Sequence, residues 1–187
     1  DEEGMCSFGN ACCFSEPAAR TADRIIAQIN PKMPTLGGKK ISLDKIDYIV
    51  PAESGLYTIG RAEIDARTQT IADYVAELVE DGATIQLGIG ALPDAIARNL
   101  MDKKDLGVHS ETLTEAMMEL VQAGVINNSK KTLNPGICIG AQAAGSEKFY
   151  EFIDHHPLFA VYPVDYVNNP YVVGQNYKQT SINSCME

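Results

Sequence analysis

Two short stretches of the sequence contain residues that could bind a ligand or react with it. Residues 84–94 read TIQLGIGALPD, in which Gly88 and Gly90 end an apolar run and precede a helix-like segment. Residues 106–111 read LGVHSE, a second strand-like run that ends at Glu111. In an open α/β sheet, ligands bind outside the carboxyl ends of the strands. The two stretches therefore predict a carboxylate that faces a group of backbone N–H donors.

The glycine stretch could also be the start of a dinucleotide site. That site needs G-x-G-x-x-G after a strand, with an acidic residue about twenty positions later. Gly88, Gly90 and the distant Glu111 fit this pattern, but Pro93 stands where the third glycine belongs. The third glycine lets helix and strand pack closely, and a pyrrolidine ring does not. The sequence therefore disfavours NAD or FAD as the ligand.

Glu111 has a second reading that involves no chemistry. A helix is expected to follow it over residues 112–124, and acidic residues are favoured before a helix N-terminus. Spacing alone leaves the nucleophilic and the capping roles of Glu111 equally open.

Histidines and cysteines give no sign of a metal or disulfide site. The Asp154-His155-His156 run has no partner at helical spacing, so no metal ion is expected. The five cysteines are irregularly spaced and form no C-x-x-C pair. We therefore expect reduced thiols and a cytoplasmic location.

Composition restricts the class of partner. The 187-residue chain has a formal net charge of −10, which argues against a nucleic-acid surface. No apolar run reaches membrane-spanning length, so no membrane partner is expected.

Periodicity predicts alternating helices and strands. Helices are expected over residues 15–30, 68–80, 91–101, 112–124 and 146–156. Strands are expected over 45–52, 83–88 and 106–111, with a strand or hairpin over 132–141 and a mixed segment over 159–167. Residues 31–40 are expected to be a loop, and the inward face of helix 68–80 is expected to carry Ile71, Val75, Leu78 and Val79. This alternation predicts an α/β fold with an open, mainly parallel sheet.

A family resemblance rests on several stretches that span nearly the whole chain. The longest runs from DGATIQLGIGALPDAI to KKDLGVHSE, and DEEGMCSFG, AQINPKMPTLGG, VDYVNNP and TSINS agree with it. Together they resemble the acetyl-CoA hydrolase/transferase family. The resemblance implies a sheet of the CoA-transferase type and a middle portion of a longer protein. Residues 1–67 would end a first domain and include a connector, with a boundary near Arg67, and residues 68–187 would begin a second.

The resemblance also implies roles for particular residues. Glu111 would be the catalytic glutamate, and Gln86 would lie near the acyl group. Gly88, Ile89 and Gly90 would form the oxyanion site, with the Ile89 N–H as a donor. The family's active-site histidine would precede Asp1, and a later glycine loop would follow Glu187.

The implied activity is transfer of coenzyme A between a short-chain acyl-CoA and a carboxylate of the acetate, butyrate or 4-hydroxybutyrate class. It would proceed through a glutamyl-CoA thioester, with coenzyme A as substrate and no permanently bound cofactor. The implied partners are acyl-CoA, short carboxylic acids and further copies of the chain in a homo-oligomer. Alternatives are an acyl-CoA hydrolase that uses the same glutamate, a non-catalytic CoA- or nucleotide-binding module, and a sugar-phosphate isomerase of related fold.

Overall fold

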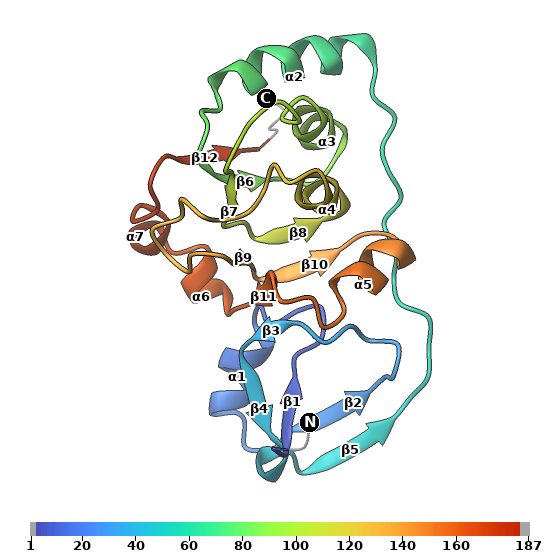
Figure 1. Cartoon of the computed structure of the whole chain (residues 1–187). Helices are drawn as coiled ribbons and strands as arrows, with labels where there is room; N and C mark the ends of the chain where they lie inside the picture. The colour runs from blue at the N-terminus through green and yellow to red at the C-terminus, as the bar shows by residue number, and fades with distance from the viewer. Residues whose placement is uncertain (1–2, 184–187) are drawn as a thin grey trace.

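A computed structural model describes residues 3–183 of the chain (Figure 1). Its strands are β1 (Met5–Ser7), β2 (Ile26–Ile29), β3 (Gly37–Gly38), β4 (Lys40–Ser42), β5 (Tyr48–Pro51), β6 (Thr84–Leu87), β7 (Gly107–Val108), β8 (Thr112–Thr114), β9 (Cys138–Gly140), β10 (Gln142–Ala144), β11 (Phe159–Val161) and β12 (Gln179–Ile182). Its helices are α1 (Ser15–Thr21), α2 (Ala66–Leu78), α3 (Ala91–Arg98), α4 (Glu115–Gln122), α5 (Glu147–Ile153), α6 (Val164–Val167) and α7 (Pro170–Val173), with a 3₁₀ turn η1 (Leu43–Lys45).

The central layer is parallel, as the alternation of strands and helices predicted. One sheet has the order β12-β6-β7 and another the order β3-β11-β9, and every neighbouring pair in both is parallel. A parallel bridge between His109 and Ile139 joins the end of β7 to β9. The expected pairing of residues 83–88 with residues 106–111 is confirmed, since Ile85 lies opposite Val108.

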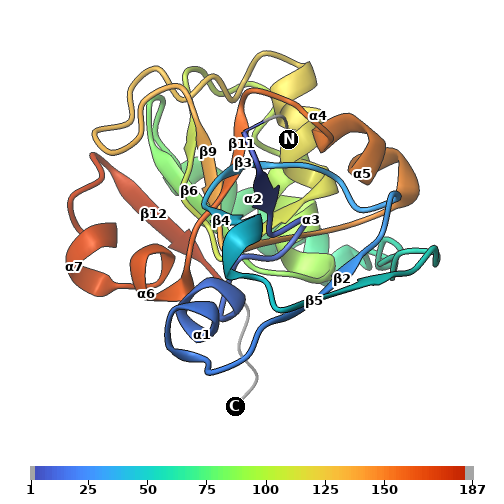
Figure 2. The same ribbon diagram turned by 90° about the horizontal axis from the view of Figure 1, so that it is seen from below.

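Helices cover the two sides of this layer. Helices α3, α4 and α5 lie on one side, with α2 outside α3, and α6 and α7 lie on the other (Figures 1 and 2). The main core lies between the layer and α2–α5 and includes Ile85, Leu87, Val108, Met117 and Phe149. Among the described residues, no helix is both long enough and apolar enough to cross a membrane.

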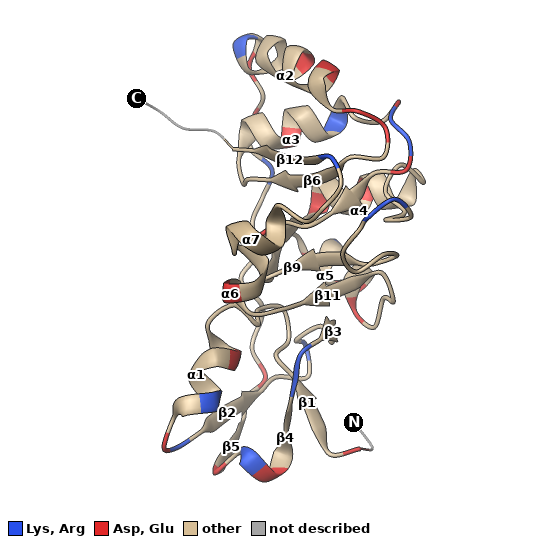
Figure 3. Cartoon of the chain, turned by 90° about the vertical axis from the view of Figure 1, so that its left-hand side faces the viewer, with Lys and Arg blue, Asp and Glu red and all other residues tan. Residues whose placement is uncertain are grey.

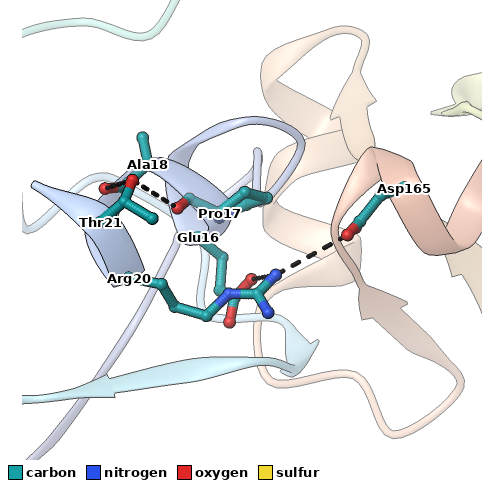
Figure 4. A network of polar contacts seen from close by, with 6 residues as sticks. All are labelled: Glu16, Pro17, Ala18, Arg20, Thr21 and Asp165. Carbon is teal, nitrogen blue, oxygen red and sulfur yellow. Dashed lines mark hydrogen bonds and ion pairs between the residues drawn. The ribbon is translucent and has the colours of Figure 1, made fainter.

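The N-terminal segment is tied to this layer at several points. Gly37–Gly38 is a strand beside β11, although residues 31–40 were expected to be a loop. Glycine is required here, because a Cβ on Gly38 would lie 2.2 Å from the carbonyl oxygen of Val161. In Figure 4, Arg20 of α1 forms an ion pair with Glu16 of the same helix, at 3.0 Å, and one with Asp165 of α6, at 3.8 Å. Such exposed pairs add little stability, so the strand pairing is the stronger link.

Three sequence-based predictions of element bounds were wrong in part. The helix expected over 15–30 ends at Thr21, because Ala22 is extended and residues 26–29 pair in parallel with β5. Strand β7 stops at Val108, well before Glu111. The helix expected over 112–124 begins only at Glu115, because Thr112–Thr114 pairs with β10 as strand β8.

The inward face predicted for the helix over 68–80 was also wrong in part. Ile71 is 39% exposed and Leu78 is 77% exposed, while Ala72, Ala76 and Val79 are buried. The helix α2, which packs on α3, thus buries small alanines in place of two of the predicted larger side chains. The helix is preceded by an extended connector over residues 52–65 that runs from β5 along one edge of the molecule (Figure 1). The domain boundary near Arg67 stays a prediction.

A buried lysine lies across β7. The Lys131 ammonium donates to the carbonyl oxygens of Val108 at 2.7 Å and Ile137 at 2.6 Å, and the residue is 5% exposed. A Cβ on Gly107 would lie 2.3 Å from Lys131 Cγ, so Gly107 makes room for this side chain. Burial lowers the pKa of Lys131 from 10.5 to about 8. A neutral amine still has two N–H donors, so both hydrogen bonds survive deprotonation.

We predict that Lys131 makes stability depend on alkaline pH. Between pH 8 and 10.5 the unfolded chain holds a proton on this lysine that the folded chain has released. The free energy of unfolding should therefore rise with pH in this window. Relative to Lys131→Met, the wild type should gain roughly 1–3 kcal/mol between pH 7.5 and 10. Urea unfolding of both proteins across these pH values measures the difference. Parallel pH profiles for the two proteins would contradict the prediction.

Candidate active site

Glu111 lies where the chain leaves one strand pairing and enters another. Before it, His109 N–H donates to the carbonyl of Ile85, and Ser110 N–H donates to that of Ile139. At the residue itself, the Glu111 carbonyl accepts from the N–H groups of Ala141 and Gln142, at 2.8 and 3.0 Å. Strand β8 then starts at the next residue. The backbone of Glu111 is therefore fixed on both sides.

The Glu111 side chain is exposed and bound by an asparagine. Asn168, which follows α6, donates its Nδ2 to Glu111 Oε2 at 2.9 Å. The capping reading of Glu111 is wrong, because α4 begins at Glu115 and its N-cap is Thr114. Strand β8 separates Glu111 from the helix, so its carboxylate does not cap α4.

The glycine stretch forms the turn from β6 into α3. The Gly88 N–H donates to the carbonyl of Ile182 at 2.9 Å, so it belongs to the sheet. Gly90 is the N-cap of α3 and has a φ of 125°, a conformation that side chains disfavour. Among the described residues, the N–H groups of Ile89 and Gly90 have no hydrogen-bond partner. Two donors at a helix N-terminus are therefore available to a negative charge.

A polar pocket of about 230 Å³ surrounds Glu111. Its lining includes Gln86, Glu111, Asn168, Gln179, Ser181 and Asn183. Gln86 and Asn183 exchange two amide hydrogen bonds, at 3.0 and 2.9 Å, across β6 and the end of β12. The structure thus brings Gln86 and Glu111 into the lining of one pocket. Ile89 and Gly90 instead line a neighbouring pocket of about 170 Å³ with Arg61 and Glu115, and Gly88 lines neither.

A buried histidine, His109, also belongs to the lining of this pocket. His109 is 1% exposed, and its Nε2 lies 2.9 Å from the carbonyl oxygen of Val167. A carbonyl only accepts, so Nε2 carries the proton and Nδ1 accepts from Asn176 at 3.2 Å. Burial lowers the pKa of His109, which keeps the ring neutral. The ring thereby fixes the backbone next to Asn168 rather than supplying a charge.

The described cysteines offer no second nucleophile. Burial raises the pKa of Cys12 to about 12, and burial together with the charge of Glu111 raises that of Cys13. Both stay thiols at neutral pH. Cys6, Cys12, Cys13 and Cys138 are free, and Cys185 lies outside the described residues. Within residues 3–183, no three His, Cys, Asp or Glu side chains cluster in a way that could hold a metal ion.

Sequence reasoning missed Asn168, His109 and the polar side of β12. Asn168 is 57 positions from Glu111 and has no local pattern that marks it. The run QTSIN did carry a signal, because Gln179, Ser181 and Asn183 alternate with apolar or inward residues. Period-two alternation places them on one face of a strand, and that face lines the pocket.

Comparisons with known proteins show what the chain is similar to. Residues 145–187 match the acetyl-CoA hydrolase/transferase C-terminal domain. The 4-hydroxybutyrate coenzyme A transferase of Clostridium kluyveri is 46% identical to this chain. The alignment covers all of this chain and 44% of that protein. The butyryl-CoA:acetate CoA-transferase of Anaerostipes caccae is 31% identical to this chain, again over all of this chain and 44% of that protein. The crystal structure of the 4-hydroxybutyrate CoA-transferase of Porphyromonas gingivalis superposes with a TM-score of 0.95 at 39% identity, over 100% of this chain and 48% of that one. The chain thus spans less than half the length of these relatives; it is similar to these CoA-transferases over its whole length and to the acetyl-CoA hydrolase/transferase C-terminal domain over residues 145–187.

Proposed function

We propose that the protein containing this chain transfers coenzyme A between a short-chain acyl-CoA and a carboxylate, with Glu111 as nucleophile. The observation that carries the proposal is the Glu111 carboxylate in a small polar pocket, held by Asn168 on a fixed backbone. The relatives named as 4-hydroxybutyrate and butyryl-CoA:acetate transferases support the reaction class. Assembly as a homo-oligomer and a cytoplasmic location stay predictions.

A carboxylate suits this chemistry because its adducts with acyl groups remain activated. Glu111 attacks the acyl-CoA carbonyl, which expels coenzyme A thiolate and leaves a mixed anhydride on the glutamate. The thiolate attacks the glutamyl carbonyl, which gives a glutamyl-CoA thioester and releases the first carboxylate. A second carboxylate attacks this thioester, and the same two steps run in reverse. The thioester bond energy is thus conserved in a covalent, ping-pong cycle.

Each tetrahedral centre in this cycle puts a negative charge on oxygen. The unpaired N–H of Ile89 at the start of α3 is the donor that we assign to this oxygen. The Gly88 N–H is not available, because it already serves Ile182. The amides of Gln86 and Asn183 hold each other in place beside the reacting groups. Removing one oxyanion donor typically raises a barrier by about 3 kcal/mol.

We predict that Glu111→Gln in the full-length protein lowers transferase activity by at least about 10³-fold, because an amide keeps the shape but is a poor nucleophile. Acyl-CoA binding should be largely retained. Borohydride after acyl-CoA exposure should reduce a thioester at Glu111 in the wild type only. Glu147→Gln, at an exposed glutamate of α5, is the matched control and should keep full activity.

Near wild-type turnover by the Gln variant, with the glutamine shown intact by mass spectrometry, would exclude Glu111 as nucleophile. Release of free coenzyme A without an acceptor acid, at the rate of transfer, would instead identify a hydrolase. Bound acyl-CoA with neither product would identify a non-catalytic module.

Asn168 should affect the rate through the carboxylate it holds. We predict that Asn168→Ala lowers kcat/KM by roughly 10- to 100-fold, since a hydrogen bond to a charged group contributes about 1.5–3 kcal/mol. Asn168→Asp should be worse, because a second carboxylate would face Glu111 within hydrogen-bond distance. Asn127→Ala is the control, because Asn127 makes a similar 2.7 Å bond to Asp105 away from the pocket. Equal rates for the Asn168 and Asn127 variants would show that Asn168 does not act on the rate through Glu111.

A further inference from the structure

Residues 168–175, named the α7 segment, form one wall of the larger pocket. Asn168 and Val173 line the pocket, and helix α7 occupies the middle of the segment. None of the segment's residues is buried, whereas Val167 and Asn176, which flank it, are both buried. The segment is therefore packed into the interior of the fold at its two ends.

Little else holds the α7 segment in place. Within residues 3–183, its hydrogen bonds stay inside the run 164–176, apart from the one that Asn168 donates to Glu111. The segment contains no Asp, Glu, Lys or Arg, so no ion pair ties it to the fold (Figure 3). A segment with few bonds to its surroundings opens locally at a small cost in free energy. The two buried ends therefore decide how firmly this wall of the pocket is held.

The imidazole of His109 bonds both of these ends. Its Nε2 donates to the carbonyl of Val167 at 2.9 Å, and its Nδ1 accepts from the side chain of Asn176 at 3.2 Å. A neutral imidazole has one donor and one acceptor, and its two partners here are one acceptor and one donor. Both nitrogens of a single ring are thus used, one on each side of the α7 segment.

His109 and Glu111 contact adjacent residues at the start of this segment. His109 bonds the carbonyl of Val167, and Glu111 accepts from the side chain of the next residue, Asn168. The contacts form a closed loop, because the backbone joins His109 to Glu111 on one side and Val167 to Asn168 on the other. A shift of Val167 relative to the imidazole would therefore move the Asn168 amide relative to the carboxylate.

We propose that His109 is a positioning residue, which holds the α7 segment so that Asn168 orients the Glu111 carboxylate for attack. This inference rests on the proposed function, because it takes Glu111 as the nucleophile. His109 transfers no proton, since its Nε2–H is bonded to a carbonyl and its Nδ1 to an amide donor. It acts only through the residues that it holds.

The first test removes both hydrogen bonds of the ring and keeps a ring of similar shape. In the full-length protein, His109→Phe should slow formation of the glutamyl-CoA thioester by about 10- to 100-fold, because a displacement of about 1 Å can cost roughly 10²-fold. The affinity for acyl-CoA should be largely retained. His109→Gln keeps a donor for the Val167 carbonyl and should recover part of the lost rate. Single-turnover mass spectrometry of the thioester measures these rates.

A double-mutant cycle separates positioning from a general loss of structure. In a protein that already carries Asn168→Ala, His109→Phe should cost little further rate, because the contact that it aligns is gone. His156→Phe is the matched control, since His156 contacts the rings of Phe152 and Phe159 and is not part of the pocket lining. This control should keep the full rate. Independent, additive losses for the His109 and Asn168 variants would overturn the inference.

Hydrogen exchange gives a readout that needs no turnover. In the ligand-free full-length protein, the amides of residues 169–176 should exchange about 10-fold faster or more in His109→Phe than in the wild type, while those of β6 should not change. Asn176→Leu is similar in volume and removes only the second bond of the ring. It should speed exchange at the end of the segment, and it serves the same tests should the phenylalanine variant fail to fold.

Unchanged exchange at residues 169–176 would show that His109 does not hold the segment and would overturn the inference. Faster exchange with an unaltered rate of thioester formation would overturn it as well, because the segment would then not orient Glu111. Absence of both transfer and thioester in the wild type would instead refute the proposed function. The exchange rates would still decide whether the imidazole anchors the α7 segment.

Discussion

The arrangement of this site depends on the backbone hydrogen bonds around Glu111. Two N–H groups, those of Ala141 and Gln142 after β9, converge on its carbonyl, just before β8 begins. These bonds make one residue the meeting point of three strand pairings. A side chain at such a point has little backbone freedom, so its direction is set by the sheet. In the proposed reaction Glu111 first attacks a carbonyl and its own carbonyl is then attacked, and a group with these two roles benefits from a fixed origin.

The two faces of the sheet differ in polarity and in what they contact. The side toward α2–α5 is apolar and supplies the stability of the fold. The side toward α6 and α7 is lined by amides, a hydroxyl and a neutral histidine. Successive side chains of β6 and β12 point to opposite faces of the sheet. Ile85 and Gln86 are therefore neighbours in the chain, but one faces the core and the other faces the pocket. Mutations on the two faces should therefore affect different properties of the protein.

Much of the fold could be predicted from the sequence where patterns are local. The apolar run before Gly88, the amphipathic segment after it and the strand before Glu111 gave the parallel pairing correctly. Long-range pairing was not predictable in the same way. Residues 26–29 look helical beside α1 yet pair with β5, and Gly37–Gly38 looks like a loop yet extends the sheet. The pocket shows the same limit, because Gln86 and Glu111 lie in marked motifs, whereas Asn168 reaches Glu111 only through the path of α6.

The pairing of β3 with β11 has a consequence for biosynthesis. The two glycines of β3 leave the ribosome long before residues 159–161, which are their partner. At roughly 5–20 residues per second, this edge of the sheet stays unpaired for on the order of ten seconds. The exposed apolar strands β2 and β5 emerge in the same interval. The nascent chain thus offers open strand edges and apolar surface at the same time, which is the state that chaperones recognise and in which aggregation competes with folding.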